Sequence, residues 1–564
     1  MEALDWVVIG VFFLALIGII VWVVRQKQND SADYFLGGRD ATWLAIGASI
    51  FASNIGSEHL IGLAGAGASS GMAMAHWEIQ GWMILILGWV FVPFYTRSMV
   101  YTMPEFLERR YNPQSRTILS VISLVSYVLT KVAVTVYAGG LVFQQVFGIK
   151  ELWGIDFFWI AAIGLVVLTA LYTIFGGMKS VLYTSVLQTP ILLLGSLIIL
   201  VLGFKELGGW DEMMRVCGAV TVNDYGDTMT NLIRSNDDAN FPWLGALIGS
   251  AIIGFWYWCT DQFIVQRVLS GKNEMEARRG TIFGAYLKLL PVFLFLIPGM
   301  IAFALHQKYI GAGGEGFLPM LANGTANADA AFPTLVAKLL PAGVKGLVVC
   351  GILAALMSSL ASLFNSSAML FTIDFYKRFR PETPEKKLVG IGQVATVVIV
   401  ILGILWIPIM RSVGDVLYTY LQDVQSVLAP GIAAAFLLGI CWKRTSAQGG
   451  MWGLIAGMVI GLTRLGAKVY YSNAGEVADS TFKYLFYDMN WLFFCGWMFL
   501  FCIIVVIVVS LATKAPTAEK IQGLVFGTAT KEQKAATRAS WNHWDIIHTV
   551  IILAITGAFY WYFW

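Results

Sequence analysis

Charged residues are scarce in this chain, and their scarcity excludes a whole class of proteins. Only 13% of the 564 residues are Asp, Glu, Lys or Arg, whereas 58% are hydrophobic. Soluble domains carry about twice that share of charge. The composition therefore excludes a soluble globular protein and predicts a polytopic protein embedded in a lipid bilayer.

Motifs for catalysis, metal binding and nucleic-acid binding are also missing. The six cysteines are scattered, with no CxxC or His-pair spacing, so neither a metal site nor a disulfide framework is expected. No nucleophile elbow, phosphate-binding glycine loop or HExxH motif occurs. The net charge is only +3 and no basic block with interleaved aromatics appears, which argues against nucleic-acid binding. We therefore expect neither an enzyme nor an organic cofactor.

What the chain has in abundance is hydrophobic runs of membrane length. A bilayer core about 30 Å thick needs about 20 apolar residues to cross it, and windows of that length identify about fourteen spans. The expected spans are roughly 4–24, 42–67, 73–96, 117–147, 153–174, 180–203, 243–265, 280–305, 342–375, 388–410, 415–440, 447–467, 490–513 and 544–563. The first is not a signal peptide, because the residues before it are acidic and its apolar run is too long.

The distribution of Lys and Arg over the loops predicts the orientation. If the N-terminus lies outside, most of the 37 basic residues fall in inward loops, and every inward loop carries at least one. Loops on the cytoplasmic side are enriched in Lys and Arg. We therefore expect both termini outside, in a plasma membrane. The modest loops, with no long glycosylated insertion, favour a bacterial inner membrane.

The second span carries polar residues that a lipid-facing helix could not keep. Asn54, Glu58 and His59 lie near its middle, among glycines. Unpaired polar groups at that depth cost several kcal/mol each. We expect a helix that breaks at Asn54–Gly56, so that freed backbone carbonyls line an enclosed cavity, as in secondary transporters that hold a cation and a substrate.

A comparable polar defect interrupts the seventh span, between Gly254 and Gln262. Because the two defects lie five spans apart, the chain is expected to contain two inverted copies of five helices, about 42–203 and 243–440. The remaining helices, 4–24, 447–467, 490–513 and 544–563, would be peripheral. The whole chain then forms a single all-α membrane domain.

Hydroxyl side chains repeat along one face of the ninth span. Ser358, Ser362 and Ser366 follow the i, i+4 spacing of a helix face. Small residues of this kind commonly pack helices together in membranes, and on this motif alone packing is favoured. The alternative is a Na⁺ site, since a hard cation prefers oxygen ligands such as hydroxyls and freed carbonyls.

Ionisable residues within the spans are candidates for function. Glu78, Asp261 and Lys288 lie inside spans 3, 7 and 8, and intramembrane ionisable residues are functional by default. Lys288 could instead extend toward the interface, and the two acids could form structural ion pairs. For Lys131 a structural salt bridge is as good an interpretation as a functional role.

Aromatic and amide groups near these charges would suit a sugar. Tyr257 and Trp258 lie beside the second break, where aromatic rings could cover the apolar C–H face of a pyranose, although such residues are usually core or interface residues. Gln422 in span 11 is either another amide facing the cavity or a cap for the kink near Pro430. The combination points to a hydroxylated, uncharged substrate.

Several stretches together resemble one family. They are Asp33–Arg39, Ala52–His59, Tyr101–Phe106, Trp256–Gln262, Val265–Arg267, Met357–Ser362 and Cys441–Arg444. The chain resembles the sodium/solute symporter family, close to its sodium/glucose and sodium/myo-inositol branch, most strongly over residues 30–445. The resemblance implies fourteen helices, a five-plus-five inverted-repeat core like that of the leucine transporter, discontinuous helices and alternating access.

The resemblance also implies where the ligands bind. The implied Na⁺ ligands are the carbonyls of Ala52, Ile55 and Ala355 and the hydroxyls of Ser358 and Ser359. The implied sugar contacts are Asn54, His59, Glu78, Tyr257, Asp261, Lys288 and Gln422. The implied gate residues are Leu63, Trp77, Trp258 and Tyr418.

Three positions depart from the family pattern. Ser185 stands where the family signature between Gly177 and Gln188 has an Asp, and Ala361 replaces a hydroxyl residue. Both changes remove ligands for a second ion, so we predict one Na⁺ per sugar. Gly254 stands where relatives carry a polar sugar contact, which leaves the exact sugar open.

The resulting hypothesis is a Na⁺-coupled symporter of a neutral monosaccharide of the glucose or galactose type. Myo-inositol is the alternative substrate. Proton coupling through His59 or Glu78 is an alternative mechanism. A sugar-gated sensor or channel is the alternative from a different functional class.

Overall fold

The computed structural model spans the whole chain and describes residues 1–26, 30–56, 58–321, 324–411, 417–473 and 478–564. For the helical residues 128–130, 133, 141, 145, 406–411, 417–421, 423 and 472–473 only the backbone is described. Within these ranges the only named strands are the antiparallel pair β1 (Glu151–Leu152) and β2 (Ile155–Asp156). The expected all-α class is confirmed.

Helices account for nearly all of the regular structure. The α-helices are α1 (Ala3–Val24), α2 (Ser31–Leu36), α3 (Trp43–Asn54), α4 (Ala64–Ser70), α5 (Ala75–Glu78), α6 (Gly81–Ile86), α7 (Val92–Ser98), α8 (Met103–Arg110), α9 (Pro113–Ser126), α10 (Ala133–Phe147), α11 (Phe157–Leu207), α12 (Trp210–Gly218), α13 (Trp243–Gly254), α14 (Gln262–Leu269), α15 (Glu274–Lys288), α16 (Ile297–Gly311), α17 (Ala331–Leu339), α18 (Val344–Met369), α19 (Lys377–Phe379), α20 (Glu385–Arg411), α21 (Leu417–Cys441), α22 (Ala447–Asn473), α23 (Thr481–Lys483), α24 (Trp491–Ala512), α25 (Lys531–Ala539) and α26 (His543–Tyr562). The 3₁₀ and π segments are η1 (Gly37–Arg39), η2 (Glu58–Leu63), η3 (Gly71–Met74), η4 (Leu87–Phe91), η5 (Tyr127–Val132), η6 (Phe255–Thr260), η7 (Val292–Leu296), η8 (Ala328–Ala330), η9 (Leu370–Tyr376), η10 (Tyr484–Asp488) and η11 (Ala518–Lys520).

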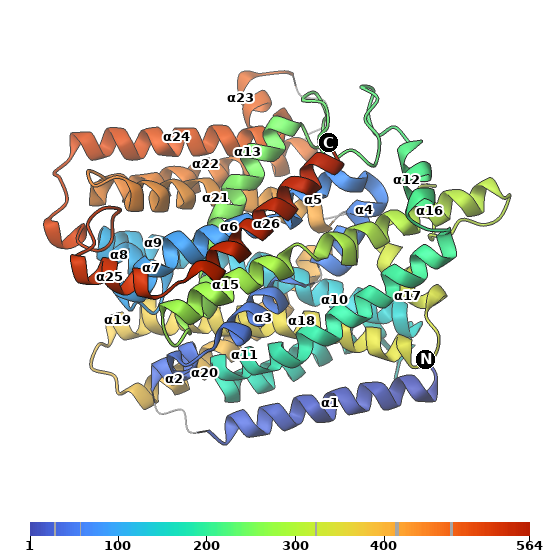
Figure 1. Cartoon of the computed structure of the whole chain (residues 1–564), viewed down its shortest axis with the longest axis horizontal. Helices are drawn as coiled ribbons and strands as arrows, with labels where there is room; N and C mark the ends of the chain where they lie inside the picture. The colour runs from blue at the N-terminus through green and yellow to red at the C-terminus, as the bar shows by residue number, and fades with distance from the viewer. Residues whose placement is uncertain (27–29, 57, 322–323, 412–416, 474–477) are drawn as a thin grey trace.

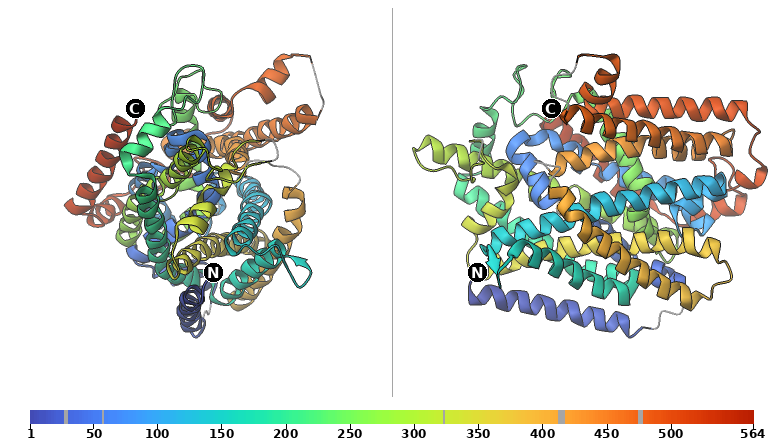
Figure 2. Two further views of the ribbon diagram at one scale, coloured as in Figure 1. Left: turned by 90° about the vertical axis from the view of Figure 1, so that its right-hand side faces the viewer. Right: turned by 180° about the vertical axis from the view of Figure 1, so that it is seen from behind.

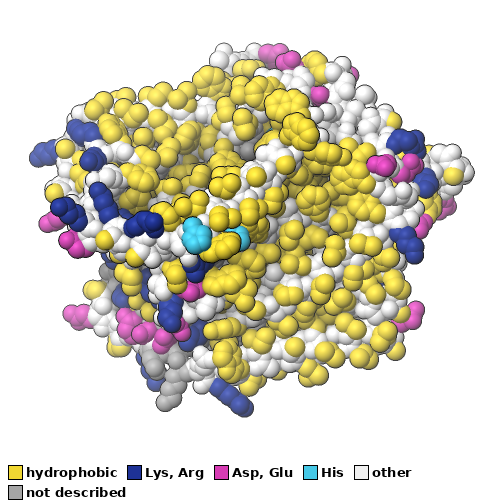
Figure 3. Space-filling model, in the orientation of Figure 1, with side chains coloured by type: hydrophobic (Ala, Val, Ile, Leu, Met, Phe, Trp, Pro, Cys, Tyr) yellow, Lys and Arg dark blue, Asp and Glu magenta, His cyan; other side chains and the backbone are white. Residues whose placement is uncertain are grey.

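The long helices run in roughly one direction and form a bundle with loops at its two ends (Figures 1 and 2). Eleven helical stretches of the described residues are long and apolar enough to cross a membrane. The face drawn in Figure 3 is hydrophobic across the middle of the bundle, and its charged side chains gather toward the two ends. This distribution is that of a protein surrounded by lipid.

The expected spans fall on helices of the described residues. Two spans were expected at 153–174 and 180–203, and the segment α11 (Phe157–Leu207) contains two helices that meet at Gly177. The backbone leaves helical geometry there, with φ +52° and ψ −148°. A Cβ at Gly177 would also collide with the Tyr34 carbonyl. Glycine therefore permits both the kink and the close approach.

Both predicted helix breaks are confirmed. Helix α3 ends at Asn54, Ile55 is extended with φ −79° and ψ 106°, and helical structure resumes at Glu58 as the π segment η2. In the seventh span, η6 ends at Thr260, Asp261 is extended with φ −77° and ψ 128°, and α14 follows. Two of the central helices are therefore discontinuous in the bundle interior.

The two termini lie at the same end of the bundle. The Asp5 carboxylate accepts hydrogen bonds from the backbone N–H groups of Gly343 (2.7 Å) and Gly346 (2.8 Å). Near the other terminus, the Phe563 carbonyl accepts a hydrogen bond from Leu232 N–H (2.9 Å). The loops before Gly343 and around Leu232 were both predicted to lie outside. Which end faces outward stays a prediction.

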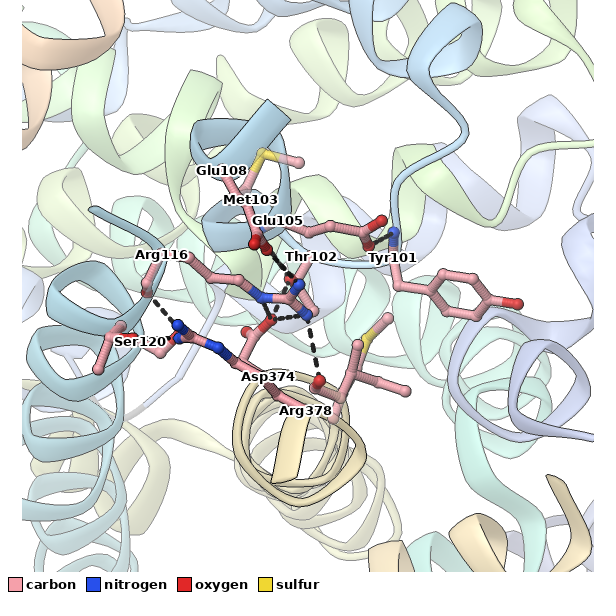
Figure 4. Close-up of polar contacts among 12 residues, drawn as sticks. Tyr101, Thr102, Met103, Glu105, Glu108, Arg116, Ser120, Asp374 and Arg378 are labelled. Carbon is pink, nitrogen blue, oxygen red and sulfur yellow. Dashed lines mark hydrogen bonds and ion pairs between the residues drawn. The ribbon is translucent and has the colours of Figure 1, made fainter. Parts of the chain in front are cut away.

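An ion-pair network ties together helices at the end predicted to face inward (Figure 4). Arg116 on α9 donates to Asp374 on η9 (2.7 Å) and to Glu108 on α8 (2.6 Å). Thr102 donates a further hydrogen bond to Asp374 (2.8 Å). This network links the end of span 9 to the segment that follows span 3.

Candidate functional site

A cavity lies beside both broken helices. It is lined by Asn54, Glu58, His59, Trp77, Glu78, Gln80, Ile253, Gly254, Tyr257, Trp258, Lys288, Gln422 and Gln425. These residues come from α3, η2, α5, the turn after α5, α13, η6, α15 and α21, so helices from both predicted repeats contribute to the wall.

A chain of polar side chains crosses the cavity. Lys288 Nζ lies 2.6 Å from Glu78 Oε2, and His59 Nε2 lies 3.3 Å from the same oxygen. Asn54 Nδ2 lies 3.3 Å from His59 Nε2. All four residues are at most 4% exposed. Because the two charges are paired, they can remain in the membrane interior and still offer donors and acceptors to a ligand.

Several buried polar atoms near this row of polar side chains have no hydrogen-bond partner among the described residues. They are Gln422 Oε1, His59 Nδ1 and Trp77 Nε1, and all three residues line the cavity. Buried polar atoms in proteins are normally hydrogen-bonded. A ligand that carries hydroxyl groups could satisfy these donors and acceptors together.

Aromatic rings form the other part of the wall. The Tyr257 and Trp258 rings meet edge to face, with centroids 4.9 Å apart. Lys288 Nζ lies 5.3 Å from the Trp258 ring centroid, and Trp77 stacks on Trp491 at 5.6 Å. The cavity therefore combines charged, amide and aromatic groups, as was expected for a sugar site.

Two of the predicted sugar-site and gate residues, Asp261 and Leu63, are not brought to the cavity wall. Asp261 caps α14 and receives hydrogen bonds from Lys131 Nζ (2.9 Å) and the Tyr127 hydroxyl. The structural ion pair left open for Asp261 and Lys131 is thus the arrangement found. Leu63 is fully buried at the end of η2 and does not line the cavity. Tyr418 lies outside the residues whose side chains are described.

Five lining residues were not among the predicted contacts, namely Glu58, Gln80, Ile253, Gly254 and Gln425. Glu58 was noticed as a polar residue of the second span but was given no role. Gln425 follows Gln422 by three residues, a spacing that places two amides on one helix face. Gln80 follows Glu78 by two residues, and the sequence alone gave no signal for its role.

One of the predicted ion ligands from another helix, Ser359 of α18, lies at the first break. A Cβ placed on Gly56 would lie 3.1 Å from Ser359 Oγ and 2.9 Å from Glu58 Oε2. Among the described residues no backbone N–H group donates to the carbonyls of Ala52 or Ile55. The break therefore brings free carbonyls, a glycine and the Ser359 hydroxyl of α18 into one small region.

The serine hydroxyls of span 9 lie in two different environments. Ser362 lies 2.6 Å from Ser53 Oγ, and Ser366 donates to Gln266 Oε1 at 2.6 Å. These two hydroxyls join helices, as the packing interpretation expected. The hydroxyl oxygens of Ser358 and Ser185 lie 3.4 Å apart, and one residue further Ser359 faces the break.

Comparisons with known proteins point to one family. The model of the sodium:solute symporter family matches residues 34–457. The sodium/myo-inositol cotransporter 2 of Mus musculus is 36% identical over 542 residues, which cover 94% of this chain and 80% of the relative. The sodium/glucose cotransporter 4 of Danio rerio is 36% identical over 537 residues, which cover 92% and 80%.

A solved structure shows the same fold. The substrate-bound, outward-open structure of a Na⁺-coupled sialic acid symporter has a TM-score of 0.72 at 22% sequence identity and covers 92% of this chain and 99% of its own. At this identity the likeness concerns the fold alone. It agrees with the expected inverted-repeat core with discontinuous helices.

Proposed function

Since this chain belongs to the sodium:solute symporter family, we propose that it couples the entry of one Na⁺ to the uptake of one neutral monosaccharide by alternating access. One observation carries the proposal: the same interrupted segment contributes to the cavity and to the proposed ion site. Asn54, at the end of α3, lines the cavity, and Gly56, two residues later, lies against Ser359 of α18.

The ion would bind where α3 is interrupted. The proposed ligands are the carbonyls of Ala52, Ile55 and Ala355 and the hydroxyls of Ser358 and Ser359. A hard cation such as Na⁺ suits an all-oxygen set of this kind. Because the ligands come from two helices, a bound ion would hold the interrupted segment against α18.

The sugar would bind in the cavity on the other side of this segment. Glu78 and Lys288 would bind hydroxyl groups through charge-assisted hydrogen bonds, with Asn54, His59 and Gln422 as further donors and acceptors. Tyr257 would cover an apolar face of the ring, and Trp77 and Trp258 would close the cavity as gate residues. Asp261 acts indirectly in this proposal, by holding the helix break that directly follows the segment η6, which carries Tyr257.

One ion per sugar is sufficient for accumulation. One charge that crosses about 100 mV supplies roughly 2.3 kcal/mol, and a tenfold Na⁺ gradient adds about 1.4 kcal/mol. Together they support roughly 500-fold accumulation of a neutral solute. A second ion site is not proposed, because Ser185 donates its hydroxyl to the Val181 carbonyl (2.6 Å) and Ala361 has no oxygen in its side chain.

The substrate is proposed to be glucose or galactose, with myo-inositol as the second candidate. Myo-inositol is favoured by the names of several relatives with about this identity, among them proteins of Mus musculus and Homo sapiens. All three compounds are neutral, cyclic and rich in hydroxyls, and so fit the same donor and acceptor set. The proposed location is a bacterial plasma membrane with both termini outside.

Uptake by proteoliposomes tests the proposal. Labelled D-glucose, D-galactose and myo-inositol are offered with an inward Na⁺ gradient, an inward K⁺ gradient or an inward pH gradient. We expect accumulation of at least one compound with Na⁺ only, at a Na⁺ to solute flux ratio of one. Uptake driven by the pH gradient without Na⁺ would instead favour proton coupling through His59 or Glu78.

Counterflow separates a carrier from a sugar-gated channel or sensor. Proteoliposomes preloaded with the unlabelled compound should take up the labelled one transiently above equilibrium, because a carrier exchanges substrates across one site. A channel shows no such overshoot. Absence of counterflow together with sugar-induced Na⁺ current would overturn the symporter proposal.

A further inference from the structure

The turn after α5 contributes a cavity residue that the proposed site does not use. Gln80 is 3% exposed and lines the cavity two residues beyond Glu78. Its Nε2 donates to the Ser250 carbonyl of α13 (2.8 Å), and its Oε1 accepts from Trp258 Nε1 (3.3 Å). Both ends of the amide are therefore held by the wall that contains the second helix break.

Gly254 gives this amide the space it occupies. A Cβ on Gly254 would lie 2.5 Å from Gln80 Oε1, 2.9 Å from Cδ and 3.0 Å from Nε2. Gln80 thus fills the volume into which a side chain at position 254 would project. The polar group at this part of the wall is supplied by residue 80 because residue 254 has no side chain.

The amide keeps hydrogen-bonding capacity after these contacts. A glutamine amide has two donor hydrogens and two acceptor lone pairs, and the contacts to Ser250 and Trp258 use one of each. One donor and one acceptor therefore remain on a group in the cavity wall. A hydroxyl group can both accept and donate, so a polyhydroxylated ring matches this remainder.

We propose that Gln80 contacts a substrate hydroxyl and that the Gln80–Gly254 pair determines which pattern of ring hydroxyls the cavity accepts. The inference rests on the proposed function, since it takes the substrate to be a neutral sugar or cyclic polyol. Its physical basis is that a site built to bind a hydroxyl rejects an analogue without that hydroxyl, because a buried polar group would be left without a partner.

The test compares monodeoxy analogues in two variants. D-Glucose, D-galactose and myo-inositol are first ranked by uptake, and the monodeoxy analogues of the best compound then compete with it. In the unaltered protein, loss of one particular hydroxyl should weaken competition by about threefold to tenfold, the worth of one net hydrogen bond. Gln80→Ala should weaken binding of the parent compound by a similar factor and abolish discrimination at that hydroxyl only.

Gly254→Ala should cause the same loss of discrimination at that hydroxyl by an independent change. Its Cβ would displace the far end of the flexible Gln80 side chain and leave the other lining residues in place. It should therefore reproduce the selectivity of Gln80→Ala, and the double variant should be no worse than Gln80→Ala alone. Gly164→Ala in α11, where a Cβ would meet nothing within 4 Å, is the matched control and should keep the original selectivity.

Two results would overturn the inference. Gln80→Ala could weaken the parent and every analogue equally, which would make Gln80 a purely structural residue. The losses in Gln80→Ala and Gly254→Ala could add, which would show that they do not act through one amide. If Gln80→Ala does not fold, Gly254→Ala alone tests the inference, and an equal loss for the parent compound and every analogue in that variant would overturn it.

Counterflow keeps this test separate from the proposed function. Selectivity among analogues can be read by counterflow without a Na⁺ gradient. If the unaltered protein carries these compounds without any Na⁺ dependence, the proposed coupling fails while the Gln80 test remains valid. A change in coupling with unchanged selectivity in both variants would overturn the role of Gln80 and leave the coupling intact.

Discussion

The two interrupted helices have the same topology but opposite local chemistry. At the first break, the carbonyls of Ala52 and Ile55 receive no backbone hydrogen bond from the described residues. At the second break, Asp261 caps the following helix and is held by Lys131 and Tyr127. The first break has oxygen atoms available to a cation, whereas the second is satisfied by Asp261 together with side chains from the segment η5.

The environment of Lys131 shows how completely the charged groups at the second break are paired. Its ammonium lies 4.6 Å from the ring centroids of both Tyr257 and Phe263, in addition to its pair with Asp261. Cation–π contacts strengthen when the cation is desolvated. The comparison indicates that a helix break in a membrane is not by itself an ion site, because its function depends on what satisfies the freed groups.

The largest expected effect concerns stability at the second break. Lys131→Met leaves the Asp261 carboxylate buried without its countercharge, and loss of one partner of a buried pair typically costs about 3–5 kcal/mol. The apparent melting temperature of the purified protein should fall sharply. Lys131→Met combined with Asp261→Asn should recover most of the loss, because no charge is then left unpaired.

An exposed pair serves as the control for this prediction. Lys377 and Glu385 lie 3.0 Å apart with side chains 34% and 44% exposed, and such surface pairs contribute at most about 1 kcal/mol. Lys377→Met should therefore change the melting temperature little. Equal effects of Lys131→Met and Lys377→Met would show that the buried pair does not hold the second break closed.

The next effect concerns ion affinity at the first break. Ser359→Ala removes the hydroxyl closest to Gly56, and we expect the Na⁺ concentration for half-maximal uptake to rise about tenfold, equivalent to about 1.4 kcal/mol. Ser366→Ala is the control, since Ser366 lies on the same helix and bonds Gln266. The ion assignment is wrong if the Na⁺ dependence of uptake is the same in Ser359→Ala and in the unaltered protein.

The sequence predicted the first break better than the second because the clues differ in range. Asn54, Gly56 and His59 lie within six residues, so a polar defect in an apolar run was visible without tertiary information. Asp261 and its partner Lys131 are 130 residues apart. Two ionisable residues inside spans could be recognised as unusual, but their pairing depends on how the helices are rotated in the bundle.

The limits of prediction from the sequence have the same physical origin at the cavity. Glu78, Lys288 and Gln422 could be selected because charges and amides are rare inside spans, and all three line the cavity. The position of Gln80 depends on the missing side chain of Gly254 on another helix, a relation that one sequence does not reveal.

The smallest expected effect concerns Gly56 at the first break. Gly56→Ala would bring a Cβ to 3.1 Å from Ser359 Oγ and 2.9 Å from Glu58 Oε2. The carboxylate is the far end of a flexible side chain and can move away, whereas the short Ser359 side chain has less freedom. We expect the Na⁺ concentration for half-maximal uptake to rise about threefold, equivalent to about 0.7 kcal/mol, with little change in melting temperature.

Gly557→Ala is the matched control, because a Cβ there would meet nothing within 4 Å in α26. It should alter neither Na⁺ dependence nor stability. If Gly56→Ala left the Na⁺ dependence unchanged, Ser359 would not be constrained by the break and the ion would have to bind elsewhere. If it instead lowered stability as much as Lys131→Met, the first break would be a structural element like the second, and the contrast between them would fail.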